Sequence, residues 1–175
     1  EACLVGSEMC IRDSLYGGVR YLFDANRQMP LEGDTKFKVL KKNYAAGSEL
    51  RGKTMGVIGF GRIGQETAKI ALGIGMNVVA HDPFMDKAEV MVVLGNGATI
   101  DVSIEMDSFE TVLKEADFIS LHVPAQDKPV IGQKEISMMK EGAGLINAAR
   151  GGVIDEEALL NACLLYTSDA ADDLW

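Results

Sequence analysis

A glycine-rich corner between a predicted strand and a predicted helix constrains this sequence more than any other feature. Residues 54–58 form a short apolar run typical of a buried strand, and the sequence GFGRIG follows directly at 59–64. Apolar residues at helical spacing between 63 and 74 predict a helix that begins inside the glycine motif. Residues 77–80 then predict a second strand. The pattern indicates a β-α-β unit with parallel strands.

The alternation of strands and helices continues along the rest of the chain. Residues 86–94 are predicted as a helix and 98–100 as a short third strand, while Asp107 and Glu110 have capping-box spacing ahead of another helix. Further strands are predicted at 118–122 and 144–147, and further helices at 133–140 and from Asp155 onward. We therefore predict the α/β class, with a doubly wound parallel sheet.

The glycine corner has the chemistry of a dinucleotide site. Gly59 permits a tight turn, Gly61 lets the backbone approach a pyrophosphate, and Gly64 allows helix and strand to pack closely. The helix N-terminus adds free N–H groups. Asp82 lies 21 residues after Gly61, at the end of the next strand, where its carboxylate can accept ribose hydroxyls and would repel a 2′-phosphate. These features favour a Rossmann dinucleotide-binding site over a glycine turn with a purely structural role. They also favour NAD over NADP as the coenzyme.

A second cluster, NAARGG at 147–152, follows the strand predicted at 144–147. Arg150 beside two glycines is suited to clamp a carboxylate, although its spacing alone fits a surface or helix-capping arginine equally well. His81 and His122 also end strands, and we expect a structural or cofactor-lining role for both. No His, Cys, Asp or Glu set has metal-ligand spacing, so we expect no metal.

Both ends of the chain carry the signature of a sequencing adapter. Residues 9–13 can be encoded by ATGTGTATAAGAGAC, whose reverse complement in a shifted frame encodes the CLLYT of residues 163–167. We expect residues 1–14 and 163–175 to be non-native, adapter-derived tails. All three cysteines and the single tryptophan lie in them, so disulfides and thiolate chemistry are excluded for 15–162.

The charge and hydropathy of the chain bear on its partners. The net charge of −9 reduces to −4 within residues 15–162, which hold 16 Lys and Arg against 20 Asp and Glu. Nucleic-acid binding requires clustered cations, so we expect no nucleic-acid partner. No apolar stretch approaches the ~20 residues that span a bilayer, so we expect no membrane partner. Separately, we expect a cytoplasmic location.

The remaining organisation follows from these elements. Residues 15–28 predict a helix that Pro30 ends, and the basic segment 34–48 predicts a solvated connecting arm. We thus expect a crossover helix and arm over 15–48, and a nucleotide-binding domain over 49–162 that is incomplete at its C-terminal end.

Several motifs together resemble the D-isomer-specific 2-hydroxyacid dehydrogenases, with the phosphoglycerate dehydrogenases as the nearest subgroup. They are ELRGKT at 49–54, GFGRIG at 59–64, ADFISLHVP at 116–124, MKEGA at 139–143 and INAARGGVIDE at 146–156. The resemblance implies an NAD-binding domain inserted into a substrate domain that is largely absent here. It also implies oxidation of 3-phospho-D-glycerate to 3-phosphohydroxypyruvate, in serine biosynthesis. Glyoxylate or hydroxypyruvate reduction, D-lactate oxidation and an NAD-sensing, co-repressor-like role stay open.

The resemblance also assigns roles to residues. It places Arg62 and Ile63 at the pyrophosphate, Asp82 on the adenosine ribose, and Val123, Ala148, Ala149 and Arg150 along the cofactor, with Arg150 as the catalytic arginine that holds a 2-hydroxy acid. The family's acid-base histidine and its glutamate lie downstream, and neither His81 nor His122 has that histidine's motif. We therefore expect this fragment to be inactive, its strand near Leu145 to leave an unpaired edge, and the complete protein to be a homodimer.

Overall fold

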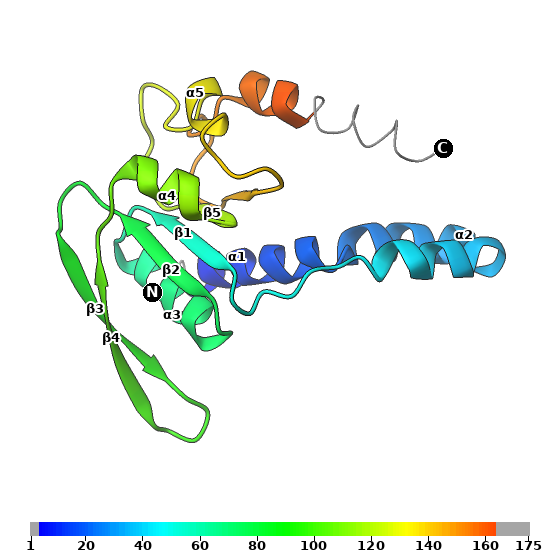
Figure 1. Cartoon of the computed structure of the whole chain (residues 1–175), viewed down its shortest axis with the longest axis horizontal. Helices are drawn as coiled ribbons and strands as arrows, with labels where there is room; N and C mark the ends of the chain where they lie inside the picture. Colours follow the sequence, from blue (N-terminus) through cyan, green and yellow to red (C-terminus); the bar gives the residue numbers. More distant parts are fainter. Residues whose placement is uncertain (1–3, 164–175) are drawn as a thin grey trace.

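The computed structural model describes residues 4–163 and places a four-stranded parallel sheet at the centre of the molecule (Figure 1). The strands are β1 (Thr54–Ile58), β2 (Asn77–His81), β5 (Phe118–Leu121) and β6 (Gly144–Asn147). Their order in the sheet is β2-β1-β5-β6, and Val57 of β1 pairs with Ala80 of β2 on one side and Ser120 of β5 on the other. This arrangement confirms the predicted doubly wound α/β class.

Helices cover both faces of this sheet. On one face lie α1 (Leu4–Val19) and α3 (Arg62–Gly73), and on the other lie α4 (Phe109–Glu115) and α5 (Gln133–Ile136) (Figure 1). Successive β1 residues point to opposite faces, as the period of a strand requires. Val57 is buried in the core shared with α1 and α3, and Ile58 in the core shared with α4. The carboxyl ends of all four strands therefore meet at one edge, between two packed layers.

The single helix predicted over residues 15–28 is wrong, and so is the loop predicted over 34–48. Residues 15–19 end α1, a turn at Arg20 and Tyr21 follows, and residues 22–28 begin the next helix. α2 (Leu22–Tyr44) continues through Pro30. A proline removes one backbone donor, and side-chain bonds from Arg27 and Gln28 to the Asp24 carboxylate support the helix beside it.

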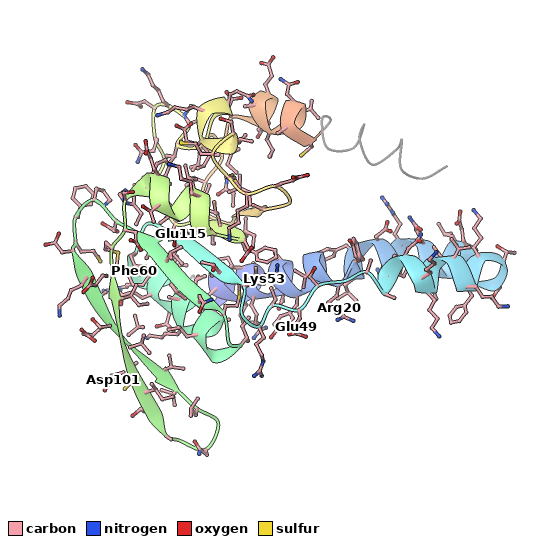
Figure 2. All side chains as sticks on the ribbon, viewed as in Figure 1. Arg20, Glu49, Lys53, Phe60, Asp101 and Glu115 are labelled. Carbon is pink, nitrogen blue, oxygen red and sulfur yellow. The ribbon has the colours of Figure 1, made fainter. Side chains whose placement is uncertain are left out.

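The arm formed by α2 projects from the body of the molecule and folds back on itself (Figure 1). A non-helical residue, Lys36, interrupts α2, and the Tyr44 hydroxyl returns to within 3.3 Å of the Asp24 carboxylate. At the root of the arm, where Figure 2 shows Arg20 and Glu49, the backbone of Ser48 donates to that of Val19 at 2.9 Å.

The helix predicted over residues 86–94 is also wrong. β3 (Lys87–Val93) pairs antiparallel with β4 (Thr99–Glu105), and the two form a separate hairpin beside α3. The strand predicted at 98–100 therefore exists as the start of β4 but does not join the parallel sheet. Beside β2, the chain forms only an isolated parallel bridge between Ala80 and Met106, and residues 98–100 do not pair there. Alternate burial of β3 residues shows the strand period that the apolar composition concealed.

Two shorter elements differ in detail from the prediction, and a third agrees with it. α4 is capped by Ser108, whose side chain accepts from the Thr111 backbone, so Asp107 is not the cap. α5 ends at Ile136 rather than at 140. A final helix over 156–163 begins as predicted after Asp155, whose carboxylate accepts from two of its backbone N–H groups.

The N-terminal tail expected over residues 1–14 lies largely within the described structure, whereas the C-terminal tail lies almost entirely outside it. Residues 4–14 belong to α1, and Ile11 is buried in the core beside α3; their adapter origin stays a prediction. Of the tail expected over 163–175, all but Cys163 lies outside the described residues. None of the helices within 4–163 has both the length and the apolar character that a membrane-crossing helix requires.

Candidate functional site

The glycine corner lies where the strand order reverses, between β1 and β5. Gly59 has a φ of +90°, and a Cβ atom on it would lie 2.7 Å from the carbonyl oxygen of His122. Its N–H donates to the His81 carbonyl at 2.9 Å, while the His122 N–H donates to the Ile58 carbonyl at 2.8 Å. Only glycine combines this conformation with so close an approach of two backbones.

The other two motif glycines have different surroundings. A Cβ on Gly64 would overlap the carbonyl oxygen of Gly59, so this glycine lets α3 pack directly against the corner. Gly61 caps α3 with no side-chain hydrogen bond, and a Cβ there would meet nothing within 4 Å. The space beside Gly61 is thus open at the positive end of α3, where the first N–H groups of a helix favour an anionic ligand.

Asp82, directly after β2, is hydrogen-bonded to the backbone of the glycine corner. Its Oδ2 accepts from the Phe60 backbone N–H at 2.8 Å, and its Oδ1 accepts from the Phe84 N–H at 2.9 Å. Phe60 is fully buried, so the carboxylate satisfies a donor that water does not reach. Each carboxylate oxygen has a second lone pair, which leaves capacity for the hydroxyls of a ribose.

A cleft of about 360 Å³ opens at this edge of the sheet. It brings together most of the residues that the resemblance placed along a cofactor, and adds residues of α1 and the segment after β5. Its lining comprises Ser7, Ile11, Ile63, His122, Val123, Pro124, Ala125, Ala148, Ala149 and Arg150. Arg62 and Asp82 do not line it. Ser7 and Ile11 were not foreseen, because they belong to the expected tail.

Arg150 lies in a turn that is stabilised by hydrogen bonds among residues 147–150. The Asn147 side chain donates to the Arg150 carbonyl at 2.8 Å and accepts from the Ala149 N–H at 3.0 Å. The Arg150 guanidinium donates to the Ala149 carbonyl at 2.9 Å and forms no ion pair within residues 4–163. A cation on the wall of a cleft is thus available to a carboxylate or phosphate.

His122 also lines the cleft, but it does not have the properties of a general base. Its Nε2 is buried and has no hydrogen-bond partner in the described structure. Burial lowers the pKa of His122 to about 4, because the apolar surroundings disfavour the charged ring. The ring is therefore neutral near pH 7, but it is too weak a base to retain a proton taken from a substrate there.

A second, smaller cavity of about 230 Å³ adjoins the cleft at Val123, which lines both. Its walls come from the ends of β1 and β2, the start of α4 and the segment after β5. They comprise Ile58, Gly59, His81, Pro83, Phe109, Val123 and Val130. The sequence pattern did not predict this cavity, although His81 and Pro83 on either side of Asp82 were a usable signal.

These features define a class of protein. Open helix N–H groups, a carboxylate at the end of the neighbouring strand, and two adjoining cavities fit the phosphates, a ribose and the two ring systems of a dinucleotide. No group of three or more potential metal ligands occurs among the residues that the structure describes. The fold and site are those of a dinucleotide-binding α/β domain.

Comparison with known proteins gives the family. The profile of the D-isomer specific 2-hydroxyacid dehydrogenase NAD binding domain matches residues 15–167. The chain therefore belongs to the D-isomer specific 2-hydroxyacid dehydrogenases, and it comprises their NAD-binding domain.

Individual relatives agree with this assignment. The chain is 45% identical to a hydroxypyruvate reductase of Thermotoga maritima over 73% of its length, and 42% identical to D-3-phosphoglycerate dehydrogenase 3 of Arabidopsis thaliana over 75%. It spans only 37% and 21% of those proteins. A solved family member from Lactobacillus delbrueckii, in its NAD-complexed form, superposes with a TM-score of 0.68 at 31% identity, covering 89% of this chain and 43% of that one.

Proposed function

We propose that this chain holds NAD along the carboxyl edge of its sheet, with the pyrophosphate at the start of α3. The open position at Gly61 is the observation that carries the proposal, because this N-cap has no side-chain hydrogen bond and a Cβ atom there would meet nothing within 4 Å. Asp82, Arg62 and Ile63 complete the phosphate and ribose contacts. Val123, Ala148, Ala149 and Arg150 line the path toward the nicotinamide end.

For the complete protein, we propose oxidation of a D-2-hydroxy acid, with 3-phospho-D-glycerate as the first candidate substrate. D-3-phosphoglycerate dehydrogenases of several organisms are among the relatives at 42–46% identity, which supports this choice. Reduction of hydroxypyruvate or glyoxylate is the second candidate, since relatives at 45% and 46% identity carry those names. D-lactate oxidation is a third.

The reaction removes the C2 hydrogen with its electron pair and the hydroxyl proton, and a C2 carbonyl forms. NAD, when bound, supplies the acceptor of that hydride. Arg150 would hold the substrate carboxylate through two parallel hydrogen bonds and stabilise negative charge that develops on the C2 oxygen. We assign the proton-accepting role to no residue within 4–163, because the pKa of His122 is about 4 and His81 lines the other cavity.

We also propose that the complete protein is a homodimer in which the α2 arm contacts a second copy. Large apolar side chains are exposed along this arm, including Phe23 at 65%, Leu31 at 81% and Val39 at 58%. Covering them would bury apolar surface that a monomer leaves in water. Light scattering on the complete protein tests this, and a monomer that persists at high concentration would contradict it. The cytoplasmic location also stays a prediction.

Calorimetric titration of the chain with NAD tests the coenzyme site. Gly61→Ala should weaken NAD binding about tenfold or more, since a methyl group would enter the phosphate space, while leaving the free energy of unfolding nearly unchanged. Gly73→Ala is the matched control, because it lies at the other end of α3 and also meets nothing within 4 Å. Equal NAD affinities for the two variants would overturn the proposed site.

Turnover distinguishes the remaining alternatives. The chain alone should produce no NADH from 3-phospho-D-glycerate, and measurable turnover would refute our expectation that it is inactive. The complete protein should turn over this substrate or one of the alternatives. NAD binding without turnover of any of them would favour the NAD-sensing role.

A further inference from the structure

The small cavity beside Asp82 contains one polar side chain among apolar walls. Of the described residues that line it, His81 alone has a polar side chain, and the others are aliphatic, aromatic, proline or glycine. Its volume of about 230 Å³ is below the ~300 Å³ at which pockets for whole drug-sized ligands begin. A cavity of this kind fits one flat ring system, and its single polar side chain can set which ring is accepted.

The hydrogen bonding of His81 determines which of its ring nitrogens is available to a ligand. Nδ1 lies 2.9 Å from the backbone carbonyl oxygen of Asp107. A carbonyl oxygen only accepts, so Nδ1 must carry the proton. In the neutral ring Nε2 then has a lone pair and no proton, and it has no hydrogen-bond partner within residues 4–163.

The ring of His81 is also fixed in orientation. It contacts the edge of Phe109 with ring centroids 5.6 Å apart and planes inclined by 60°. Phe109 is the first residue of α4, and the helix is capped by Ser108 directly before it. The bond from Nδ1 to Asp107 and the contact with Phe109 restrain the ring, and the same bond leaves Nε2 as the acceptor.

We propose that Nε2 of His81 accepts a hydrogen bond from the exocyclic amine of the coenzyme's adenine, and that the small cavity thereby selects adenine over purines that lack this amine. The inference rests on the proposed NAD site, in which Asp82 holds the adjacent ribose. It makes His81 a specificity-determining residue of the coenzyme site. The amine is a donor, whereas the carbonyl that replaces it in hypoxanthine would place an acceptor against the lone pair of Nε2.

The test compares NAD with nicotinamide hypoxanthine dinucleotide by calorimetric titration of the chain at pH 8. The unsubstituted chain should bind NAD about tenfold more tightly, because hypoxanthine loses one hydrogen bond and places an acceptor against the lone pair of Nε2. Equal affinities would overturn this inference alone. Failure to bind either dinucleotide would overturn the proposed coenzyme site as well.

Two variants separate selectivity from folding. His81→Phe keeps an aromatic ring beside Phe109 but removes both nitrogens, so the ratio of the two dissociation constants should fall below about twofold. Val130→Ala alters the same cavity wall and leaves the His81–Asp107 bond and the contact with Phe109 in place, so both affinities should fall while the ratio is retained. A ratio that survives in His81→Phe would overturn the proposal.

One further measurement needs no variant. The ¹⁵N NMR spectrum of the unsubstituted chain should show Nδ1 of His81 protonated and Nε2 unprotonated. The opposite tautomer would also overturn the proposal, because Nε2 would then be a donor facing a donor.

Discussion

Replacing Asp82 with alanine should lower both the stability of the chain and its affinity for NAD. The carboxylate accepts two backbone N–H groups, from Phe60 at 2.8 Å and from Phe84 at 2.9 Å. Phe60 belongs to the glycine corner and is fully buried, so its N–H would lose its only partner away from water. Phe84 is 93% exposed, and water would replace its bond at little cost.

The magnitude follows from this asymmetry. An unsatisfied buried donor costs about 1–3 kcal/mol, and the bond to a charged acceptor adds to the loss, so we expect the free energy of unfolding to fall by about 2–4 kcal/mol. Loss of the ribose contacts should raise the NAD dissociation constant about tenfold, which corresponds to about 1.4 kcal/mol.

Urea unfolding and calorimetric titration with NAD measure the two effects. Asp86→Ala is the matched control, because Asp86 is an exposed aspartate of the same connection and its carboxylate makes no hydrogen bond within the described residues. It should change neither quantity by more than a few tenths of a kcal/mol. If Asp82→Ala matched this control in both assays, the reasoning about the corner would be refuted. A loss of stability with unchanged NAD affinity would refute the ribose contact alone.

Three further changes test the packing and charge of the fold. Gly64→Ala should lower the free energy of unfolding in urea by more than about 2 kcal/mol, because its Cβ would overlap the carbonyl oxygen of Gly59; an unchanged midpoint would contradict this. Since burial holds the pKa of His122 at about 4, against about 6.5 unfolded, stability should fall by about 2 kcal/mol between pH 7 and pH 5, as the unfolded chain takes up the proton first. His122→Phe should remove this part of the pH dependence, and an identical pH profile would count against it. Ser108→Ala should cost about 1 kcal/mol in thermal or urea unfolding by removing the cap on the Thr111 N–H, whereas Ser108→Asp should retain most of the stability.

Much of the sheet could be predicted from the sequence because its strands are short apolar runs with clear boundaries. The runs at 54–58, 118–122 and 144–147 are short, apolar and bounded by polar or glycine residues, and each became a strand within one residue of its predicted bounds. The hairpin was missed for the opposite reason. Residues 87–93 alternate between α3 and solvent, but apolar Met91 and Val93 lie on the exposed side and concealed the period of two.

In the candidate site, too, some residues could be predicted from the sequence and others could not. The glycine corner and Asp82 belong to a local motif, so their positions followed from spacing. The small cavity depends on a contact between His81 and the backbone of Asp107, 26 residues apart, which no local pattern encodes. The helix through Pro30 likewise depends on contacts with the returning half of the arm, including the Tyr44 hydroxyl.

The close approach of Gly59 to the backbone of His122 bears on the rigidity of the coenzyme-binding site before NAD binds. It joins β1 to β5 at the point where the two cavities adjoin, and neither strand end can shift without displacing the other. The cradle is thus pre-organised during folding, and little conformational entropy remains to be lost when NAD arrives. Hydrogen exchange in β1 and β5 should be slow before the coenzyme is added, so the affinity of this domain reflects its contacts more than any rearrangement.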